Sequence, residues 1–472
     1  MNRHSSNCTH PIPYFVAYPT PYVVAYTTPH VVAHRVGALR RCFWRNLAIW
    51  GVILSWMGPC LLRASDPYYA SVYVGQPGSS GNSDGTNAHA FLNSPVAVTF
   101  DASGNAYVAD GNAVRKITYV GTDVVLKTLA GIPGVSGQND GAGSQARFRA
   151  PQGIACSSVG NLFVADTLND NIRMVTPLGQ VTTISGTALE PGNADGTNTQ
   201  ARFSNPQGVA ISPDGTVFIA DSGNNTVRKM VLSGGNWIVS TIAGLAGAAG
   251  TNDGLGTSAR FNGPLGMAIY TTNLLVCDFA NHTIRKLTPS GTNWTSTTFA
   301  GAPGAFGSVD GPVGIARFNR PNGIAVDSAG NVFISDEGNS TIRKITPAGM
   351  VSTVAGLAGN PGMSNGVATE ARFDLPAGLS SHPAGGVLLA DYGNFTVRRI
   401  QFGVPLRANI AGSRVVLSWS AVANDVFPQA RASLLNGFQW TNVPGTILTS
   451  GGRCYATNNY VPGSYFFRLY KP

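Results

Sequence analysis

Arginine recurs at one position of a repeated Gly-rich stretch, always between Ala and Phe. The five copies are Arg147, Arg202, Arg260, Arg317 and Arg372. A ring of guanidinium groups would bind an anionic ligand through paired hydrogen bonds. The alternative is that each arginine bonds the carbonyls or the aspartate of its own loop. We favour this alternative, because a feature present in every repeat is usually architectural.

Binding specificity requires residues that break the repeat, and four such residues stand out. His282 and Glu337 depart from the pattern, and so does the pair Tyr392 and Phe395. Exposed aromatic rings suit sugars or peptides, although single surface aromatics are common without a function. We interpret these four residues, together with the five loop arginines, as candidate binding residues.

The elements that position these residues belong to a repeat of about 56 residues. Three series keep this period: a Pro that opens each unit (Pro95, Pro151, Pro206, Pro264, Pro321, Pro376), an Asp that closes its second apolar run (Asp110, Asp166, Asp221, Asp278, Asp336, Asp391) and an Arg in its third run (Arg115, Arg173, Arg228, Arg285, Arg343, Arg398). The Asp and the Arg are interpreted as structural pairs.

Each unit predicts four short antiparallel strands. In the fifth copy they are residues 323–326, 332–335, 341–345 and 351–356, separated by turns rich in Gly, Asn and Ser. Four antiparallel strands form one blade of a β-propeller. The sixth unit lacks a fourth strand, and residues 72–75 resemble one. We therefore expect this N-terminal strand to complete the last blade and close the ring.

The predicted fold is all-β: a six-bladed β-propeller closed by an N-terminal strand, plus a small C-terminal β-sandwich-like domain. The repeated motifs Pro-x-Gly-(Ile/Val)-Ala and Asp-x-x-Asn-x-x-(Ile/Val)-Arg resemble the NHL repeat family over residues 70–402. The long insert before each Pro is similar to that of secreted bacterial and teneurin-like NHL propellers. The resemblance implies a propeller, and it does not by itself decide the function.

The long insert also predicts where a partner binds. It joins the fourth strand of one blade to the first strand of the next, on the same face as the turn between the second and third strands. Long loops on a rigid scaffold commonly carry binding sites. We expect a protein or polysaccharide partner on this face.

An enzymatic function has little support in the residue types. After residue 64 the chain has three histidines (His89, His282 and His382), at unrelated repeat positions, and it has no Cys-x-x-Cys. Metal sites need converging His, Cys or carboxylate groups. We predict no catalytic residue, no metal ligand and no cofactor. A Ca²⁺ ion in the central channel, and a metal-dependent hydrolase or lyase of the lactonase or esterase type, remain the alternative.

The N-terminal region is interpreted as targeting sequence. Residues 1–39 are a low-complexity leader, and our hypothesis places the true start of translation near Val36 or Leu39. Residues 40–64 have the basic, apolar and small-residue order of a signal peptide. We expect a secreted or cell-surface protein from a bacterium, bound to a membrane only if this segment stays uncleaved.

The remaining predictions concern the C-terminal region and the net charge of the chain. Residues 404–472 alternate apolar and polar residues around Trp419 and resemble a short fibronectin III-like or Ig-like module. Six of the 31 basic residues lie in residues 1–64, where no acidic residue occurs, so the remainder is only mildly basic. This charge does not suit a nucleic-acid partner. We expect a monomer.

Overall fold

The computed structural model describes residues 68–401, apart from Thr122 and Ala384, and the backbone of short strands at 23–25 and within 407–470. Two units make up the chain, and one of them is Tyr68–Phe402. Every regular element of this unit is a strand or a 3₁₀ turn. Among the described residues, no helix has the length and apolar character needed to span a membrane.

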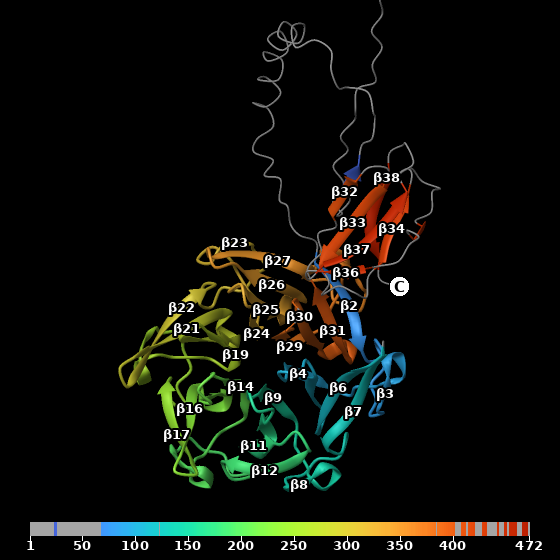
Figure 1. The fold of residues 1–472 in the computed structure, drawn as a ribbon. Coiled ribbons are helices and arrows are strands. Elements are labelled where there is room, and N and C mark those ends of the chain that lie inside the picture. Colours follow the sequence, from blue (N-terminus) through green and yellow to red (C-terminus); the bar gives the residue numbers. More distant parts are fainter. Residues whose placement is uncertain are drawn as a thin grey trace, which may run out of the picture. The chain divides into compact units, whose positions relative to one another are not determined.

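Residues 68–402 form six blades arranged around a centre, as Figure 1 shows. The innermost strands are β4 (Pro95–Phe100), β9 (Pro151–Cys156), β14 (Pro206–Ile211), β19 (Pro264–Tyr270), β24 (Pro321–Val326) and β29 (Pro376–Ser381). The second strands are β5 (Ala106–Asp110), β10 (Leu162–Asp166), β15 (Val217–Asp221), β20 (Asn273–Asp278), β25 (Val332–Asp336) and β30 (Val387–Asp391). The third strands are β6 (Ala113–Val120), β11 (Asn171–Val175), β16 (Thr226–Ser233), β21 (Thr283–Ser290), β26 (Thr341–Ile345) and β31 (Thr396–Gln401).

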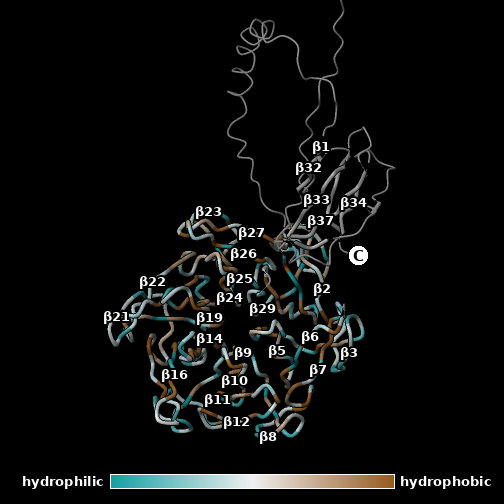
Figure 2. The backbone as a smooth tube through the Cα atoms, viewed as in Figure 1, coloured by the Kyte–Doolittle hydropathy of each residue, from teal (hydrophilic) through white to brown (hydrophobic). Residues whose placement is uncertain are grey.

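The fourth strands lie outside the third. They are β7 (Asp123–Gly131), β12 (Gln180–Ser185), β17 (Asn236–Ala243), β22 (Asn293–Ala300), β27 (Met350–Gly356) and, in the sixth blade, β2 (Tyr69–Val74). Each blade gains a fifth strand of two residues from the preceding loop: β3 (Gly85–Thr86), β8 (Gly141–Ala142), β13 (Gly196–Thr197), β18 (Gly254–Leu255), β23 (Gly311–Pro312) and β28 (Gly366–Val367). Hydrophobic and hydrophilic segments interleave within every blade (Figure 2). The all-β, six-bladed prediction is confirmed.

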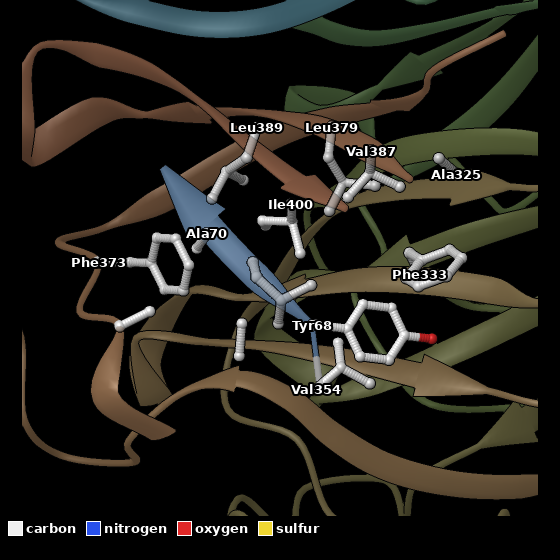
Figure 3. Packing of buried hydrophobic residues seen from close by; sticks show 13 residues of the cluster. Tyr68, Ala70, Ala325, Phe333, Val354, Phe373, Leu379, Val387, Leu389 and Ile400 are labelled. Carbon is white, nitrogen blue, oxygen red and sulfur yellow. The ribbon is translucent and has the colours of Figure 1, made fainter. Parts of the chain in front are cut away.

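The closure predicted from the sequence is also confirmed. Strand β2 pairs with β31 in antiparallel register, from Tyr69 opposite Gln401 to Val74 opposite Val397. Figure 3 shows Tyr68 and Ala70, at the beginning of β2, among the buried side chains that join the fifth and sixth blades. The two ends of the propeller therefore meet in one blade, and the ring has no open sheet edge there.

The Pro-x-Gly motif has a steric cause. A Cβ added to Gly153 would lie 2.1 Å from the carbonyl oxygen of Gln207, and one added to Gly208 would lie 2.0 Å from that of Leu265. In the five blades with this glycine, the innermost strand therefore approaches the next one too closely for a side chain at this position, whereas the first blade has Ala97 there. The residue before each of these glycines remains free to vary.

A phenylalanine fills the space between blades in five copies. Phe148, Phe203, Phe261, Phe318 and Phe373 are fully buried. In the first copy, residue type alone predicts Phe91 as the corresponding plug, but Phe91 is only half-buried, and Leu92 is the fully buried residue. The prediction was wrong by one residue: Phe91 takes the place of the loop arginine and packs under Gly81, as Arg147 packs under Gly137.

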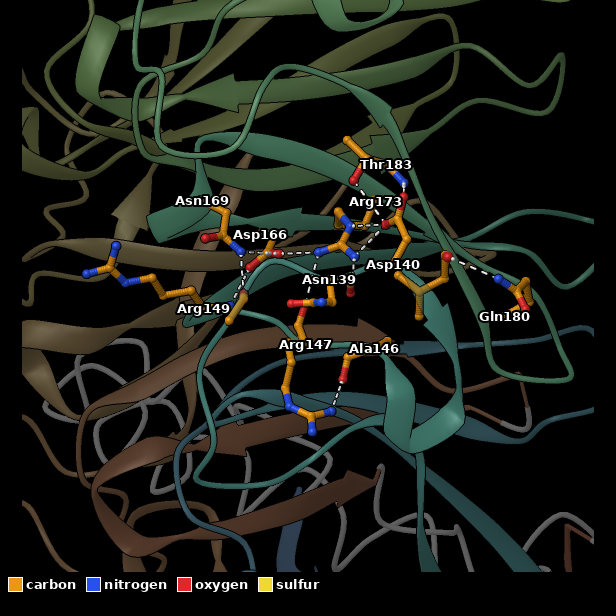
Figure 4. A network of polar contacts seen from close by, with 12 residues as sticks. Asn139, Asp140, Ala146, Arg147, Arg149, Asp166, Asn169, Arg173, Gln180 and Thr183 are labelled. Carbon is orange, nitrogen blue, oxygen red and sulfur yellow. Dashed lines mark hydrogen bonds and ion pairs between the residues drawn. The ribbon is translucent and has the colours of Figure 1, made fainter.

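The predicted Asp–Arg pair is a buried network, drawn for the second blade in Figure 4. Arg173 has a fully buried side chain and donates from Nη1 to Asp166 at 2.7 Å and from Nη2 to Asp140, on the preceding loop, at 2.6 Å. Its guanidinium carbon lies 5.2 Å from the centre of the Phe148 ring. Asp140 also accepts from the backbone N–H and hydroxyl of Thr183 in the fourth strand. One guanidinium thus links two strands, a loop and an interblade plug.

The sixth blade has a weaker version of this network. Asn365 replaces the loop aspartate, so Arg398 donates to an uncharged amide oxygen at 3.1 Å and keeps one ion pair, with Asp391. The residue on the closing strand is Val72, which offers a backbone N–H but no hydroxyl. Burial lowers the pKa of Arg398 below its ordinary value, against the opposing effect of Asp391.

The second unit comprises Met1–Pro67 and Gly403–Pro472. Its strands form two four-stranded sheets, in the orders β32-β33-β37-β36 and β1-β38-β34-β35. The bounds are β1 (Val23–Ala25), β32 (Arg407–Ala411), β33 (Arg414–Ser420), β34 (Phe427–Arg431), β35 (Thr441–Asn442), β36 (Leu448–Ser450), β37 (Arg453–Asn459) and β38 (Tyr465–Tyr470). The fibronectin III-like or Ig-like assignment stays a prediction. The expected signal peptide lies outside the described residues.

Closure by β2 makes Val74 essential to the stability of the propeller. Val74 is 1% exposed. The substitution Val74→Asp should therefore lower the free energy of unfolding by about 3 kcal/mol or more, because it buries an unpaired charge. Chemical denaturation of the full chain measures the loss. Ser80→Asp, at an exposed position just after the strand, should change little; equal effects of the two substitutions would contradict the role of β2.

Restoring the missing aspartate should strengthen the sixth blade. Asn365→Asp should raise the free energy of unfolding by about 1 kcal/mol, because a hydrogen bond to a charged acceptor is stronger than one to a neutral acceptor. The matched reverse change is Asp310→Asn in the fifth blade, where Asp310 accepts from Arg343 at 2.8 Å. It should cost a similar amount. A loss of stability in Asn365→Asp would show that Asn365 has another role.

Candidate functional site

One end of the propeller carries both the long loops before the innermost strands and the turns between the second and third strands. We call this end the long-loop face. In five blades the turn is a 3₁₀ segment: η3 (Thr167–Asn169), η5 (Ser222–Asn224), η7 (Phe279–Asn281), η8 (Glu337–Asn339) and η10 (Tyr392–Asn394). The first blade has only Gly111 and Asn112 there, because its turn is two residues shorter.

The five loop arginines bond their own loops. Arg147 Nη1 donates to the carbonyls of Ser144 and Ala146 at 2.5 and 2.7 Å, and the same bonds recur at Arg202 and Arg260. Arg317 and Arg372 bond the corresponding carbonyls. All five are half-buried. The structure does not bring them together at the channel, and a ligand-binding role for them stays a prediction.

His282 belongs to a series of bonds between blades. The residue after each of these 3₁₀ segments has a left-handed backbone, and in the second and third blades its side chain accepts from a backbone N–H of the next blade: Asp170 from Asn205 and Asn225 from Gly263. At His282, φ is 60° and Nδ1 accepts from the N–H of Arg320 at 3.1 Å. Burial, and secondly the charge of Arg320, lower the pKa of His282 below its ordinary value of 6.5. Its neutral form is the one that can accept this bond.

A cavity of about 510 Å³ occupies the channel at the long-loop face. Its wall contains the variable residues of the Pro-x-Gly motifs, namely Val96, Gln152, Gln207, Leu265, Asn322 and Ala377. Glu337 and Tyr392 also line it, and they occupy the first position of their 3₁₀ segments. The structure therefore brings together two of the four repeat-breaking residues. The volume of the cavity lies within the usual range of small-ligand sites.

Glu337 is held in this wall by an amide. Its Oε2 accepts from Nδ2 of Asn322 at 2.6 Å. Burial raises the pKa of Glu337 above its ordinary value of 4.5, against the opposing effects of this bond and of Arg320. Within residues 68–401, no cation lies within ion-pair distance of Glu337.

Of the two aromatic residues Tyr392 and Phe395, only Tyr392 lies at the cavity. Tyr392 lines the cavity and is 38% exposed, whereas Phe395 takes the left-handed position after η10, with φ 57°. Sequence reasoning missed Gln152, Gln207 and Asn322. The signal that could have identified them is variation at one position of an otherwise constant motif.

Two Gly-x-Ser-x-Gly stretches, which sequence reasoning also missed, bear on the hydrolase alternative. They are Gly81–Gly85 and Gly362–Gly366, both in long loops. The carbonyls of Ser83 and Ser364 accept from Arg115 and Arg398, so these stretches belong to the buried network. They lack the strand–turn–helix setting of a hydrolase nucleophile. In the described part of the chain, no three His, Cys, Asp or Glu side chains converge as metal ligands.

Comparison with known proteins agrees with this architecture. The NHL repeat family matches residues 203–230 and 318–345. The chain is 29% identical over 292 residues to "Protein SUPPRESSOR OF QUENCHING 1, chloroplastic" of Arabidopsis thaliana and 28% identical over 342 residues to NHL repeat-containing protein 2 of Gallus gallus. These matches cover 58% and 64% of this chain but only 27% and 46% of the relatives. Teneurin-3 of Mus musculus is 24% identical over 370 residues, 70% of this chain and 13% of the relative.

Among solved structures, an auxiliary nutrient binding protein from Bacteroides thetaiotaomicron has the same fold, with a TM-score of 0.53 and 16% identity over 71% of this chain and 76% of that one. The class of protein follows from the repeats and the six blades. The chain contains NHL repeats, and its described residues 68–401 fold as a six-bladed β-propeller.

The bond of His282 to the next blade can be tested by two substitutions. His282→Ala should lower the free energy of unfolding by about 1–2 kcal/mol, since it removes the acceptor and places alanine in a left-handed backbone. His282→Asn should be nearly neutral, because asparagine keeps both properties, as at Asn225. Urea denaturation at pH 8 measures the difference. Equal losses in both variants would show that the imidazole acts through packing instead.

The same bond predicts a pH dependence. The folded-state pKa of His282 is lowered, so its contribution to stability is present above the unfolded pKa of about 6.5 and is lost as the pH falls through the folded pKa. The difference in stability between the unsubstituted chain and His282→Asn should therefore change between pH 7 and pH 5, in favour of the variant. A constant difference would contradict a neutral, accepting His282.

Proposed function

We propose that this propeller is the binding module of a secreted or cell-surface protein, and that its long-loop face presents the channel mouth to a protein or polysaccharide partner. The observation that carries the proposal is the wall of the cavity. Its backbone is fixed by Pro-x-Gly in almost every blade, while the side chains that line it differ from blade to blade. Variable side chains on a rigid frame are typical of a binding site.

Two further observations support this function. The solved propeller of the same fold from Bacteroides thetaiotaomicron is named a nutrient binding protein. The basic and apolar residues 40–64 are typical of a secretory signal. The proposal involves no metal and no cofactor. Within residues 68–401, no arrangement of side chains favours the hydrolase or lyase alternative, so we do not carry it further.

Tyr392 and Phe395 provide the test of the binding face. The double substitution Tyr392→Ala/Phe395→Ala should reduce binding of the full chain to immobilised bacterial cell-wall polysaccharides at least about tenfold, because aromatic anchors carry much of the energy of such contacts. A glycan microarray measures this binding. The control is Leu178→Ala, since Leu178 is 93% exposed in a turn between third and fourth strands, at the other end of the blade. Unchanged binding in the double variant, or an equal loss in the control, would exclude this face.

A further inference from the structure

The wall of the channel cavity has an unusual charge composition. Of the residues that line it, Glu337 is the one acidic side chain; the polar remainder consists of carboxamides, a serine and the phenol of Tyr392. Lysine, arginine and histidine are absent from this lining. The wall therefore offers an acidic group and no basic one, and it is unsuited to phosphates, uronates and other anions.

The hydrogen bonds that join neighbouring blades do not explain why a glutamate occupies position 337. The same position in the second and third blades holds Thr167 and Ser222, whose hydroxyls donate to the carbonyls of Pro206 and Pro264 in the next blade, at 2.7 and 2.5 Å. A carboxylate cannot donate such a bond. Among the described residues, Glu337 instead accepts one side-chain hydrogen bond, from Asn322, and this half-buried carboxyl group has no ion-pair partner there. A carboxylate in this state is stabilised by a bound cationic group.

The opposite side of the cavity carries unused carboxamides. Gln152 and Gln207, in the second and third blades, line the cavity, and their side chains make no hydrogen bond within the described residues. A carboxamide donates and accepts at once, as a sugar hydroxyl does. Tyr392 adds a partly exposed ring at the mouth, on which the apolar face of a pyranose can pack.

We propose that this cavity binds a saccharide with a free amino group, whose ammonium group contacts Glu337 while its hydroxyls bond Gln152 and Gln207. The inference rests on the proposed binding function and narrows it to amino sugars. The variable side chains of the Pro-x-Gly motifs determine the specificity: carboxamides bind hydroxyls on one side, and the carboxylate binds the amine on the other.

The test uses two tetrasaccharides that differ only at nitrogen. Isothermal titration calorimetry of the full chain with β-1,4-linked glucosamine tetramer and with its fully N-acetylated counterpart should give at least about tenfold tighter binding of the free amine. Glu337→Gln should abolish that preference and leave the binding of the acetylated tetramer unchanged. The double variant Gln152→Ala/Gln207→Ala should weaken both. Glu190→Gln, which removes an exposed carboxylate bound to Arg202 on a loop, is the matched control and should have no effect.

The outcomes separate this inference from the binding function itself. Equal binding of the two tetramers, or a Glu337→Gln variant that keeps the preference, overturns the amine contact while the saccharide-binding function stands. Failure of both tetramers to bind overturns the amino-sugar assignment; the microarray with the Tyr392 and Phe395 variant then decides on the binding face separately. Tighter binding of a Gly-Ser-Gly-Ser peptide with a free amine than of the glucosamine tetramer assigns the site to peptides instead. Thermal melting of each variant confirms that it folds.

Discussion

The buried arginine of the third strand is the interaction on which the rest of the propeller depends. In the second blade, Arg173 contacts the aspartates of the second strand and of the preceding loop, and it lies over the ring of Phe148. A buried ion pair contributes little net stability compared with apolar residues of the same size, but removing one partner costs about 3–5 kcal/mol. The arginine therefore specifies how each long loop lies on its blade more than it stabilises the fold. Asp166, which Arg173 holds, also accepts from the N–H of Arg149, just before the innermost strand of the same blade.

Because this network holds the backbone, side chains at the channel mouth can change without loss of the fold. The residue inside each Pro-x-Gly motif lines the cavity, and so does the first residue of the 3₁₀ segment in the fifth and sixth blades. If the six repeats were identical, each blade would contribute the same side chains to the cavity. The cavity has a carboxamide side at Gln152 and Gln207 and an acidic side at Glu337, so a ligand can bind in one orientation.

The sequence was sufficient for the fold, because each blade repeats the same constraints on Pro, Gly, Asp and Arg, and the closing strand follows from counting strands. The site was only partly predictable. Glu337 and Tyr392 were identified because they break the repeat. His282 also breaks it, yet its Nδ1 accepts the bond that Asp170 and Asn225 accept elsewhere, and residue type alone does not reveal this equivalence. Gln152 and Gln207 were missed because the sequence cannot distinguish a glutamine that lines the channel from one that is exposed on the outer surface. Only the folded structure shows that both line the channel.

The departures from the repeat gather around the sixth blade, and they have one physical consequence. That blade is built from both ends of the propeller, has Asn365 in place of an aspartate, and has Phe395 where the first four blades place an acceptor for the next blade. In the fifth blade, Ser340 makes no side-chain hydrogen bond to the sixth among the described residues, and Ser335 instead donates to the carbonyl of Ala377 in the sixth blade at 2.5 Å. Glu337 and Tyr392 belong to these two blades, so a ligand that contacts both would add a further link between them, and binding would stabilise the closure of the ring.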